Sequence, residues 1–292
     1  MEQRLYRSRL VLPVNEPKFI EKAHTRNADL YVLDLEDSIP SSNKATARDL
    51  VKKSVDMLKT KELVVYVRVN NDQNLEEDLL AVSKSTANGI VLPKVESAEE
   101  LLKVLSFLQK HMDPEQYATF NISILIESIK GYTNLEEILS CSSKIDTASY
   151  GMEDLTSEFN FIYSPETEKY LDYLRIKLIM LSKLNGIKPM GLVGSITNFK
   201  DLVAFRKSAE KAYEIGYEGS SCIHPAQVAI LNESFAPSKE SLIRMQELVA
   251  VFEEAIQNGR ASTTFEGKMI DYPHYEASKK TLIQYGFSEG SK

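Results

Sequence analysis

The segment LYVLDLED, residues 30–37, places a continuous apolar run directly before a cluster of acidic side chains. A strand that is apolar at every position must be covered on both faces, as in a parallel sheet flanked by helices. Comparable runs recur, and helical spacing follows them: RLVL (9–12), LVVYV (63–67), GIVL (89–92), ISILI (122–126), TASY (147–150), MGLV (190–193) and SCI (221–223). Eight strands alternating with helices predict a (β/α)8 TIM barrel, for which about 230 residues suffice.

An open, doubly wound sheet is the alternative reading of the same alternation. That fold places a glycine-rich phosphate-binding turn after the first strand, whereas residues 13–17 read PVNEP. Sequences typical of capping boxes at residues 97–100 and 133–136 mark helix starts between the strands. We therefore predict an α/β barrel domain over residues 1–235.

The chain continues for a further 57 residues, which exceeds what one barrel needs. Apolar residues at helical spacing predict a helix from Lys239 to Gln257, followed by a turn or hairpin through residues 259–271 and a last helix. We predict that residues 236–292 form a C-terminal helical extension, an arm or lid that contacts a neighbouring subunit.

Composition excludes several classes of protein. The 35 basic and 42 acidic residues give a net charge of −7, which argues against nucleic-acid and membrane-surface partners. The two cysteines, Cys141 and Cys222, lie too far apart for a disulfide framework or a CxxC zinc site. No apolar run is long enough for a membrane helix and no secretory signal precedes Arg7, so we expect a cytoplasmic protein.

Polar side chains, most of them ionisable, gather where the predicted strands end. Because the chemistry of a barrel takes place at the carboxyl ends of its strands, these positions are the candidate site. They are Asp34, Glu36 and Asp37 after the second strand, Arg68 and Asn70 after the third, Lys94 and Glu96 after the fourth, Glu127 after the fifth, Glu153 and Asp154 after the sixth, and His224 after the eighth. Scattered surface charge would not produce this alignment.

The carboxylates on this rim outnumber the cations, so protons or a metal must offset their repulsion. Hard oxygen ligands without neighbouring histidine or cysteine favour Mg²⁺, which takes one or two carboxylates and keeps sites for water and substrate. Glu127 and Asp154 end adjacent strands and are the predicted pair. The alternative for each is a carboxylate that only stabilises a helix N-terminus.

Other rim residues also have two readings. Arg68 binds a substrate carboxylate or enolate oxygen, or else forms a buried ion pair with a rim acid. Glu36 and Asp37 support the site or cap the helix that begins near Lys44. His224 precedes Pro225 at a helix start, so it holds a loop or contacts a ligand rather than acting as a base.

These motifs together resemble the citrate lyase β-subunit-like family of the HpcH/HpaI aldolase and citrate lyase superfamily. The resemblance covers nearly the whole chain and rests on eight segments in order: RSRL (7–10), LDLEDS (33–38), VRVN (67–70), GIVLPKVES (89–97), LIES (125–128), GMEDL (151–155), CIHPAQ (222–227) and GKMID (267–271). It implies a TIM barrel assembled as a homotrimer or hexamer, with the C-terminal segment exchanged between subunits.

The resemblance also implies site residues and an activity. Mg²⁺ is expected on Glu127 and Asp154, the substrate on Arg68, and the acid/base on Asp271 from an adjacent subunit. Arg7 and Lys18, placed near the first strand's end, are expected to hold the substrate or its CoA part. The implied reaction is cleavage or formation of a citryl-, malyl- or citramalyl-CoA, which yields a 2-oxo acid and acetyl-CoA or a homologue.

Three departures from the family pattern keep the substrate open. Val14 stands where a glycine is common, and Met190 and Ser195 stand at positions that are often acidic. An aldolase of free hydroxy-oxo acids, a malyl-CoA-type thioesterase and a citrate lyase subunit that needs an acyl-carrier partner therefore remain as alternatives.

Overall fold

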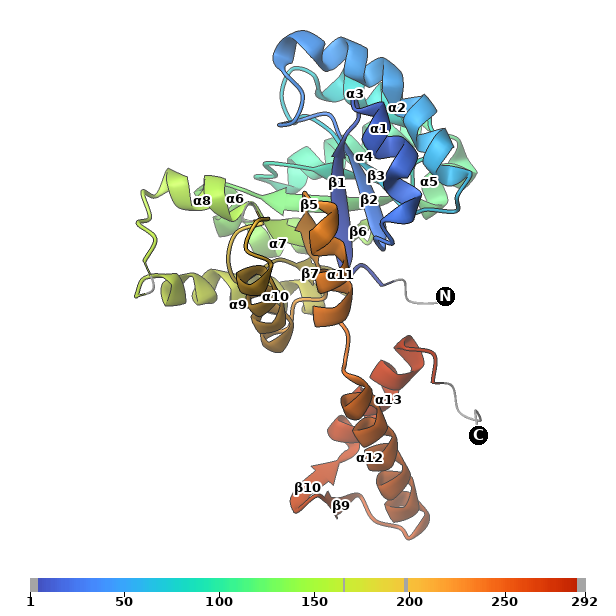
Figure 1. Cartoon of the computed structure of the whole chain (residues 1–292), viewed down its shortest axis with the longest axis vertical. Helices are drawn as coiled ribbons and strands as arrows, with labels where there is room; N and C mark the ends of the chain where they lie inside the picture. Colours follow the sequence, from blue (N-terminus) through green and yellow to red (C-terminus); the bar gives the residue numbers. More distant parts are fainter. Residues whose placement is uncertain (1–4, 165, 197–198, 288–292) are drawn as a thin grey trace. The chain divides into compact units, whose positions relative to one another are not determined.

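The computed structural model describes residues 5–164, 166–196 and 199–287. The chain divides into two compact units, one formed by residues 6–235 and the other by residues from 236 onward together with Leu5. In Figure 1 the first unit carries the strands β1–β8 and the second carries helices α12 and α13.

Eight parallel strands form one sheet in the first unit. The sheet order β7-β6-β5-β4-β3-β2-β1-β8 pairs neighbouring strands from β1 to β7 and pairs β1 with β8. Two backbone hydrogen bonds join the remaining ends, from Gly191 N–H to the Gly219 carbonyl (2.9 Å) and from Glu218 N–H to the Pro189 carbonyl (2.9 Å). The strands therefore close into a barrel, and the predicted TIM-barrel fold is confirmed. Their bounds are β1 Ser8–Pro13, β2 Leu30–Asp34, β3 Val65–Arg68, β4 Gly89–Leu92, β5 Asn121–Ile126, β6 Ile145–Tyr150, β7 Lys188–Met190 and β8 Ser220–Cys222.

Helices follow the strands in sequence. They are α1 Pro17–Lys22, α2 Lys44–Lys59, α3 Leu75–Ser83, α4 Ala98–His111, α5 Pro114–Thr119, α6 Ile129–Thr133, α7 Leu135–Ser140, α8 Met152–Glu158, α9 Asp172–Leu184, α10 Leu202–Ile215 and α11 Pro225–Ser234. None of the helices in the described ranges is both long and apolar enough to span a bilayer.

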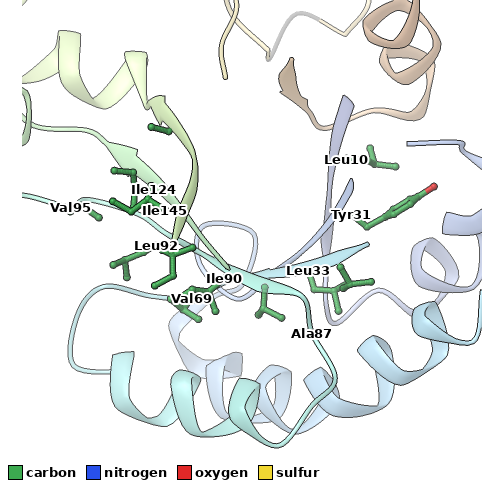
Figure 2. Packing of buried hydrophobic residues seen from close by; sticks show 14 of the residues in the cluster. Leu10, Tyr31, Leu33, Val69, Ala87, Ile90, Leu92, Val95, Ile124 and Ile145 are labelled. Atoms are coloured by element: carbon green, nitrogen blue, oxygen red, sulfur yellow. The ribbon is translucent and has the colours of Figure 1, made fainter. Parts of the chain in front are cut away.

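The strands are apolar on both faces because both faces are buried. One set of alternating side chains, including Tyr31, Leu33, Ile90 and Leu92, packs with the helices in the main core, part of which Figure 2 shows. The other set, which includes Leu30, Val32, Tyr66, Val91 and Met190, forms a second buried cluster. Successive strand residues point to opposite faces, so the second cluster fills the inside of the barrel.

Local boundaries correct two sequence-based expectations. The seventh strand ends at Met190 instead of beginning there, because residues 188–190 pair with β6 and the chain then turns through Gly191. Ser97 does cap α4, since its hydroxyl accepts the Glu100 N–H at 3.2 Å. The capping box predicted at Thr133 is wrong, because Thr133 ends α6 and α7 begins after Asn134 without a side-chain cap.

The second unit is a helical hairpin with a small sheet. Helix α12 spans Lys239–Gln257, as predicted. Strands β9 (Ser262–Phe265) and β10 (Lys268–Asp271) pair as an antiparallel hairpin, and α13 follows over Tyr272–Gln284. Its own small core is formed by Phe252, Ile270 and Tyr275.

Candidate active site

A pocket of about 960 Å³ lies at the carboxyl ends of the strands. The residues that end or follow the strands contribute its polar wall, as expected for the functional face of a barrel. These residues include Asp34, Asp37, Arg68, Glu127, Glu153, Asp154 and Ser195, and apolar side chains such as Val11, Phe19, Leu125 and Met190 complete the lining.

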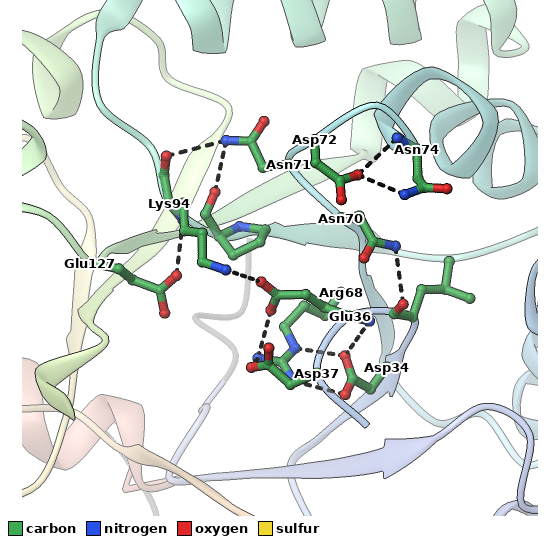
Figure 3. A network of polar contacts seen from close by, with 12 residues as sticks. Asp34, Glu36, Asp37, Arg68, Asn70, Asn71, Asp72, Asn74, Lys94 and Glu127 are labelled. Carbon is green, nitrogen blue, oxygen red and sulfur yellow. Dashed lines mark hydrogen bonds and ion pairs between the residues drawn. The ribbon is translucent and has the colours of Figure 1, made fainter. Parts of the chain in front are cut away.

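Arg68 is held by a buried carboxylate at the end of the neighbouring strand. Arg68 and Asp34 are register partners in β3 and β2, and the guanidinium donates through Nε and Nη2 to both oxygens of Asp34 at 2.7 Å each. Asp34 is fully buried, and its oxygens also accept the backbone N–H groups of Glu36 and Ser38. Figure 3 shows this network. The guanidinium is therefore fixed in orientation by a bidentate charge-assisted pair.

Glu36 and Asp37 surround the rest of the guanidinium. Arg68 Nη1 lies 2.9 Å from Glu36 Oε2 and 3.1 Å from Asp37 Oδ2. Glu36 also pairs with Lys94 Nζ at 3.1 Å, so it bridges two cations. Burial raises the pKa of Glu36, and the charge of Asp37 adds to this shift. Since α2 begins only at Lys44, neither acid caps that helix.

Glu127 is a carboxylate in need of a counter-cation. One oxygen accepts the Lys94 backbone N–H at 3.1 Å, and Lys94 adopts a positive φ of 53° to present it. Burial, reinforced by the negative charges of Glu36 and Asp154, raises the pKa of Glu127 to about 7. A divalent cation beside Glu127 would favour the ionised form and remove this repulsion.

Gly151 has no side chain, and the Glu127 carboxylate occupies the space that a side chain at this position would need. A Cβ atom on Gly151 would lie 2.2 Å from Glu127 Oε1 and 2.6 Å from its Cγ. Gly151 precedes α8, whose first turn carries Asp154, so this contact brings the ends of β5 and β6 together. The glycine is required for close approach and not for an unusual backbone angle, because its φ is −81°.

This contact predicts the effect of Gly151→Ala. Since φ permits alanine, we expect the barrel to fold, but the methyl group must displace the Glu127 carboxylate. Mg²⁺ affinity should fall at least about tenfold, as when a residue that supports a metal ligand is lost. Isothermal calorimetry with MgCl₂ measures this, with thermal unfolding as the check on folding. Unchanged Mg²⁺ affinity would show that the Glu127 position is unimportant for the ion.

The donor set fits Mg²⁺ better than a transition metal. Across the described part of the chain no cluster of three or more His, Cys, Asp or Glu side chains is arranged to hold an ion. Glu127 and Asp154 line the same pocket, and the charge of Asp154 contributes to the raised pKa of Glu127. Mg²⁺ is commonly bound by one or two carboxylates, with water and substrate completing its shell, so two carboxylates are a sufficient protein contribution.

Arg7 does not join this site. It precedes β1 at the amino end of the strand, and its guanidinium binds Asp29 (Nε to Oδ2, 2.8 Å) and the Asn232 carbonyl. The prediction that Arg7 lies near the carboxyl end of the first strand is therefore wrong. Lys18 is exposed in the first turn of α1, next to Phe19, which lines the pocket.

His224 and Asp271 both start helices. His224 caps α11, accepts the Ala226 N–H on Nδ1 at 3.2 Å and stacks on Phe199, which agrees with its reading as a residue that holds a loop. Asp271 belongs to the C-terminal unit, where it caps α13 and lies 2.5 Å from His274 Nδ1.

Asp34 and Lys94 lie at the centre of the network, although the sequence predicts only their position at strand ends and no role for either. Asp34 is the last residue of a buried strand, and its register with Arg68 follows once the two strands are paired. Lys94 follows Pro93 directly after β4. The signal for both was their position at strand ends, but sequence could not show that they neutralise or orient other site residues.

The fold and site define a class of protein: an enzyme built on a (β/α)8 barrel, with a guanidinium held by carboxylates and two further carboxylates, Glu127 and Asp154, in the same pocket. The sequence of residues 7–225 matches the HpcH/HpaI aldolase/citrate lyase family. The chain belongs to that family, and it is a lyase, as the sequence analysis predicted.

Relatives match over most of the chain. The human mitochondrial citramalyl-CoA lyase is 31% identical and is aligned over 94% of this chain and 84% of its own length. A citrate lyase subunit beta-like protein from Deinococcus radiodurans is 32% identical, with 96% and 97% covered. In structure, the protein CitE from Mycobacterium tuberculosis, solved with magnesium, acetoacetate and coenzyme A, superposes with a TM-score of 0.75 at 22% identity, covering 96% of this chain and 97% of that one.

Proposed function

We propose that this protein is a Mg²⁺-dependent carbon–carbon lyase that cleaves or forms a 3-hydroxyacyl-CoA of the citryl-, malyl- or citramalyl-CoA type. The products of cleavage would be a 2-oxo acid and acetyl-CoA or a homologue. The observation that carries the proposal is the single pocket that gathers Arg68, Glu127 and Asp154. Similarity to a citramalyl-CoA lyase supports the thioester substrate.

In this proposal Glu127 and Asp154 hold the ion. Bound Mg²⁺ would supply Lewis-acid polarisation of the hydroxy- or oxo-acid oxygens. Glu127 is oriented for this task by the Lys94 N–H and by its contact with the Gly151 backbone. The raised pKa of Glu127 fits a carboxylate whose full ionisation depends on a bound cation.

Arg68 would offset the negative charge that develops on the thioester enolate. Asp34 fixes its Nε and Nη2 edge, and Glu36 and Asp37 hold Nη1. The Asp37 side chain is 70% exposed, so this contact is the easiest to release when substrate arrives. Glu36 and Asp37 would then act by positioning Arg68 and by tuning its charge.

Val14 does not argue for a different substrate. Its side chain is buried in the core with the surrounding helices and does not line the pocket. The space for a CoA thioester is therefore not reduced by this residue. Exposed Lys18 is our proposed contact for a phosphate of CoA, because it is a cation next in sequence to a pocket residue, Phe19.

We propose that the C-terminal unit packs on a neighbouring subunit of a homotrimer or hexamer and supplies Asp271 as the acid/base. Asp271→Ala should then lower turnover about a hundredfold or more, the usual contribution of general acid–base catalysis, and leave Mg²⁺ affinity unchanged. Steady-state kinetics and calorimetry test both expectations. Asp271→Asn is the matched variant, because asparagine keeps the helix cap and removes the ionisable group. Unchanged turnover in both variants would remove Asp271 from the mechanism.

The proposed activity is tested with the purified chain, MgCl₂ and a panel of citryl-, malyl- and citramalyl-CoA. Release of a 2-oxo acid together with acetyl-CoA or a homologue, abolished by EDTA and restored by Mg²⁺, is the expected result. Free CoA thiol without oxo acid would identify a thioesterase instead. No product from any thioester would contradict the proposal.

We place the reaction in the cytoplasm, because Cys141 and Cys222 are both free thiols.

A further inference from the structure

Arg9 is a charged side chain inside the barrel that the proposed reaction does not use. It lies in β1, is only 4% exposed, and lines the same pocket as Arg68 and Glu127. The guanidinium of arginine stays protonated under ordinary conditions. Burying it therefore costs free energy unless an anion lies close enough to offset its positive charge. The question is which anion does so.

Serine hydroxyls are the groups that contact the guanidinium. Nη1 donates to Ser123 Oγ at 2.6 Å, Nε to Ser221 Oγ at 2.8 Å and Nη2 to Ser149 Oγ at 3.3 Å. These hydroxyls come from β5, β8 and β6, so three strands hold one guanidinium in place. Neutral hydroxyls orient the cation, but they do not neutralise it.

Within the described residues no carboxylate lies within 4.0 Å of Arg9. Asp146 is the group whose negative charge raises the pKa of Arg9 most, yet the two form no ion pair among the described residues. Asp146 instead accepts a hydrogen bond from the Tyr66 hydroxyl through one oxygen, and its other oxygen has no partner among those residues. Burial lowers the pKa of Arg9 to about 10, and the charge of Arg68 works in the same direction. The cation is therefore oriented but not paired.

The guanidinium keeps hydrogen-bonding capacity for a ligand. It has five N–H donors, and three are used by the serines. One donor remains on each terminal nitrogen, which is the number that a carboxylate needs for a two-point contact. Because Arg9 lines the pocket, these donors are within reach of a molecule bound there.

Apolar side chains form part of the pocket wall between Arg9 and the two carboxylates, Glu127 and Asp154. Val11 follows Arg9 by two residues on β1, Leu125 lies between Ser123 and Glu127 on β5, and both line the pocket. Glu127 lies four positions after Ser123, which corresponds to about 13 Å between their Cα atoms in extended chain. The pocket thus has two carboxylates for a cation at the ends of the strands. Deeper in the barrel, Val11 and Leu125 can contact the methylene groups of a ligand, and the Arg9 guanidinium lies beyond them without a paired anion.

We infer that Arg9 is the floor of a second anion subsite, which receives the distal carboxylate of a substrate whose 2-oxo or 2-hydroxy acid half is dicarboxylic. This inference rests on the proposed function, because it assumes that the acid half of the substrate enters this pocket. Arg9 then determines specificity, since a substrate that ends in a methyl group leaves a buried guanidinium unpaired.

Binding of matched acids tests the inference without turnover. Full-length protein with MgCl₂ is titrated calorimetrically with 2-oxoglutarate and 2-oxopentanoate, and with malate and 2-hydroxybutanoate, pairs that differ only by a carboxylate in place of a methyl group. We expect the dicarboxylate of at least one pair to bind at least about tenfold more tightly, as a charge-assisted contact provides. In Arg9→Met the two members of each pair should bind within about twofold of each other.

A second variant guards against loss of folding. Arg9→Lys keeps the charge but cannot make a two-point contact, so the dicarboxylate preference should fall at least about threefold, and thermal unfolding reports whether each variant is folded. No preference in wild type, no binding of either dicarboxylate, or a preference that survives in a folded Arg9 variant would overturn the inference. An inactive protein that shows the preference would contradict the proposed lyase alone, and an active lyase without it would contradict the Arg9 subsite alone.

Discussion

Replacing Glu127 with glutamine is expected to lower turnover at least about a thousandfold and to remove measurable Mg²⁺ binding. Glutamine keeps the size of the side chain and its ability to accept the Lys94 N–H, which lies 3.1 Å away. It lacks the negative charge that a hard cation requires. Loss of Lewis-acid stabilisation worth several kcal/mol corresponds to a rate loss of this size.

The measurement is kcat with a saturating CoA thioester, combined with calorimetric titration of MgCl₂. Glu136→Gln is the matched control, because Glu136 is an exposed residue of α7 in the same part of the chain and lies outside the pocket. It should retain wild-type kcat and Mg²⁺ affinity. If the Glu127 variant keeps its Mg²⁺ affinity while the control behaves as wild type, the metal is held elsewhere and the pair with Asp154 is wrong.

The sequence predicts most of the barrel because each strand has to be apolar on both faces. Residues 30–34 show this clearly, and the rule places Arg68 and Glu127 at the carboxyl ends of their strands. Strand seven was predicted too late in the sequence because residues 190–193 are more apolar than the three-residue strand Lys188–Met190. Hydrogen bonding with β6 fixes this strand, and hydropathy does not report it.

Which charged residues meet could be predicted less well. Asp34 and Glu36 are both acidic residues that follow the same apolar run, so the sequence does not distinguish them. Only the register of β2 with β3 shows that Asp34 faces Arg68. Arg7 and Arg9 are two residues apart, but one pairs with Asp29 before the strand begins and the other lies inside the barrel. The contact of Asp271 with a substrate depends on another subunit in our proposal, so no pattern within one chain can establish it.

Arg68→Met is expected to destabilise the barrel by about 3–5 kcal/mol at pH 7, the usual cost of leaving a buried charge without its partner. Asp34 has no exposed surface and would keep hydrogen bonds from the N–H groups of Glu36 and Ser38 and from the Ser38 side chain, none of which carries a positive charge. Urea unfolding followed by circular dichroism measures the free energy of unfolding. Arg206→Met is the matched control, since its surface pair with Glu233 should contribute less than about 1 kcal/mol.

The pH dependence of the free energy of unfolding tests whether the unpaired Asp34 carboxylate causes the loss of stability in Arg68→Met. Burial favours its neutral form, but hydrogen bonds and charge from Arg68 outweigh burial and lower its pKa in the wild type. That contribution to stability is present above the unfolded pKa of about 3.9 and is lost as pH falls through the lower folded pKa. In the variant, burial is opposed only by the hydrogen bonds from Glu36 and Ser38, so we expect the pKa of Asp34 to rise and acid to relieve the penalty by protonating the carboxylate. The difference between wild type and variant should therefore shrink from pH 7 toward pH 4.

A double variant separates the ion pair from the loss of packing. Arg68→Met combined with Asp34→Asn removes both charges, and it should recover much of the stability lost in Arg68→Met and show no comparable dependence on pH. A single variant whose destabilisation is the same at pH 4 and pH 7, and which Asp34→Asn does not improve, would attribute the loss to packing of the arginine side chain. Activity should stay low in the double variant even where stability returns, because the guanidinium proposed to offset the enolate charge is absent.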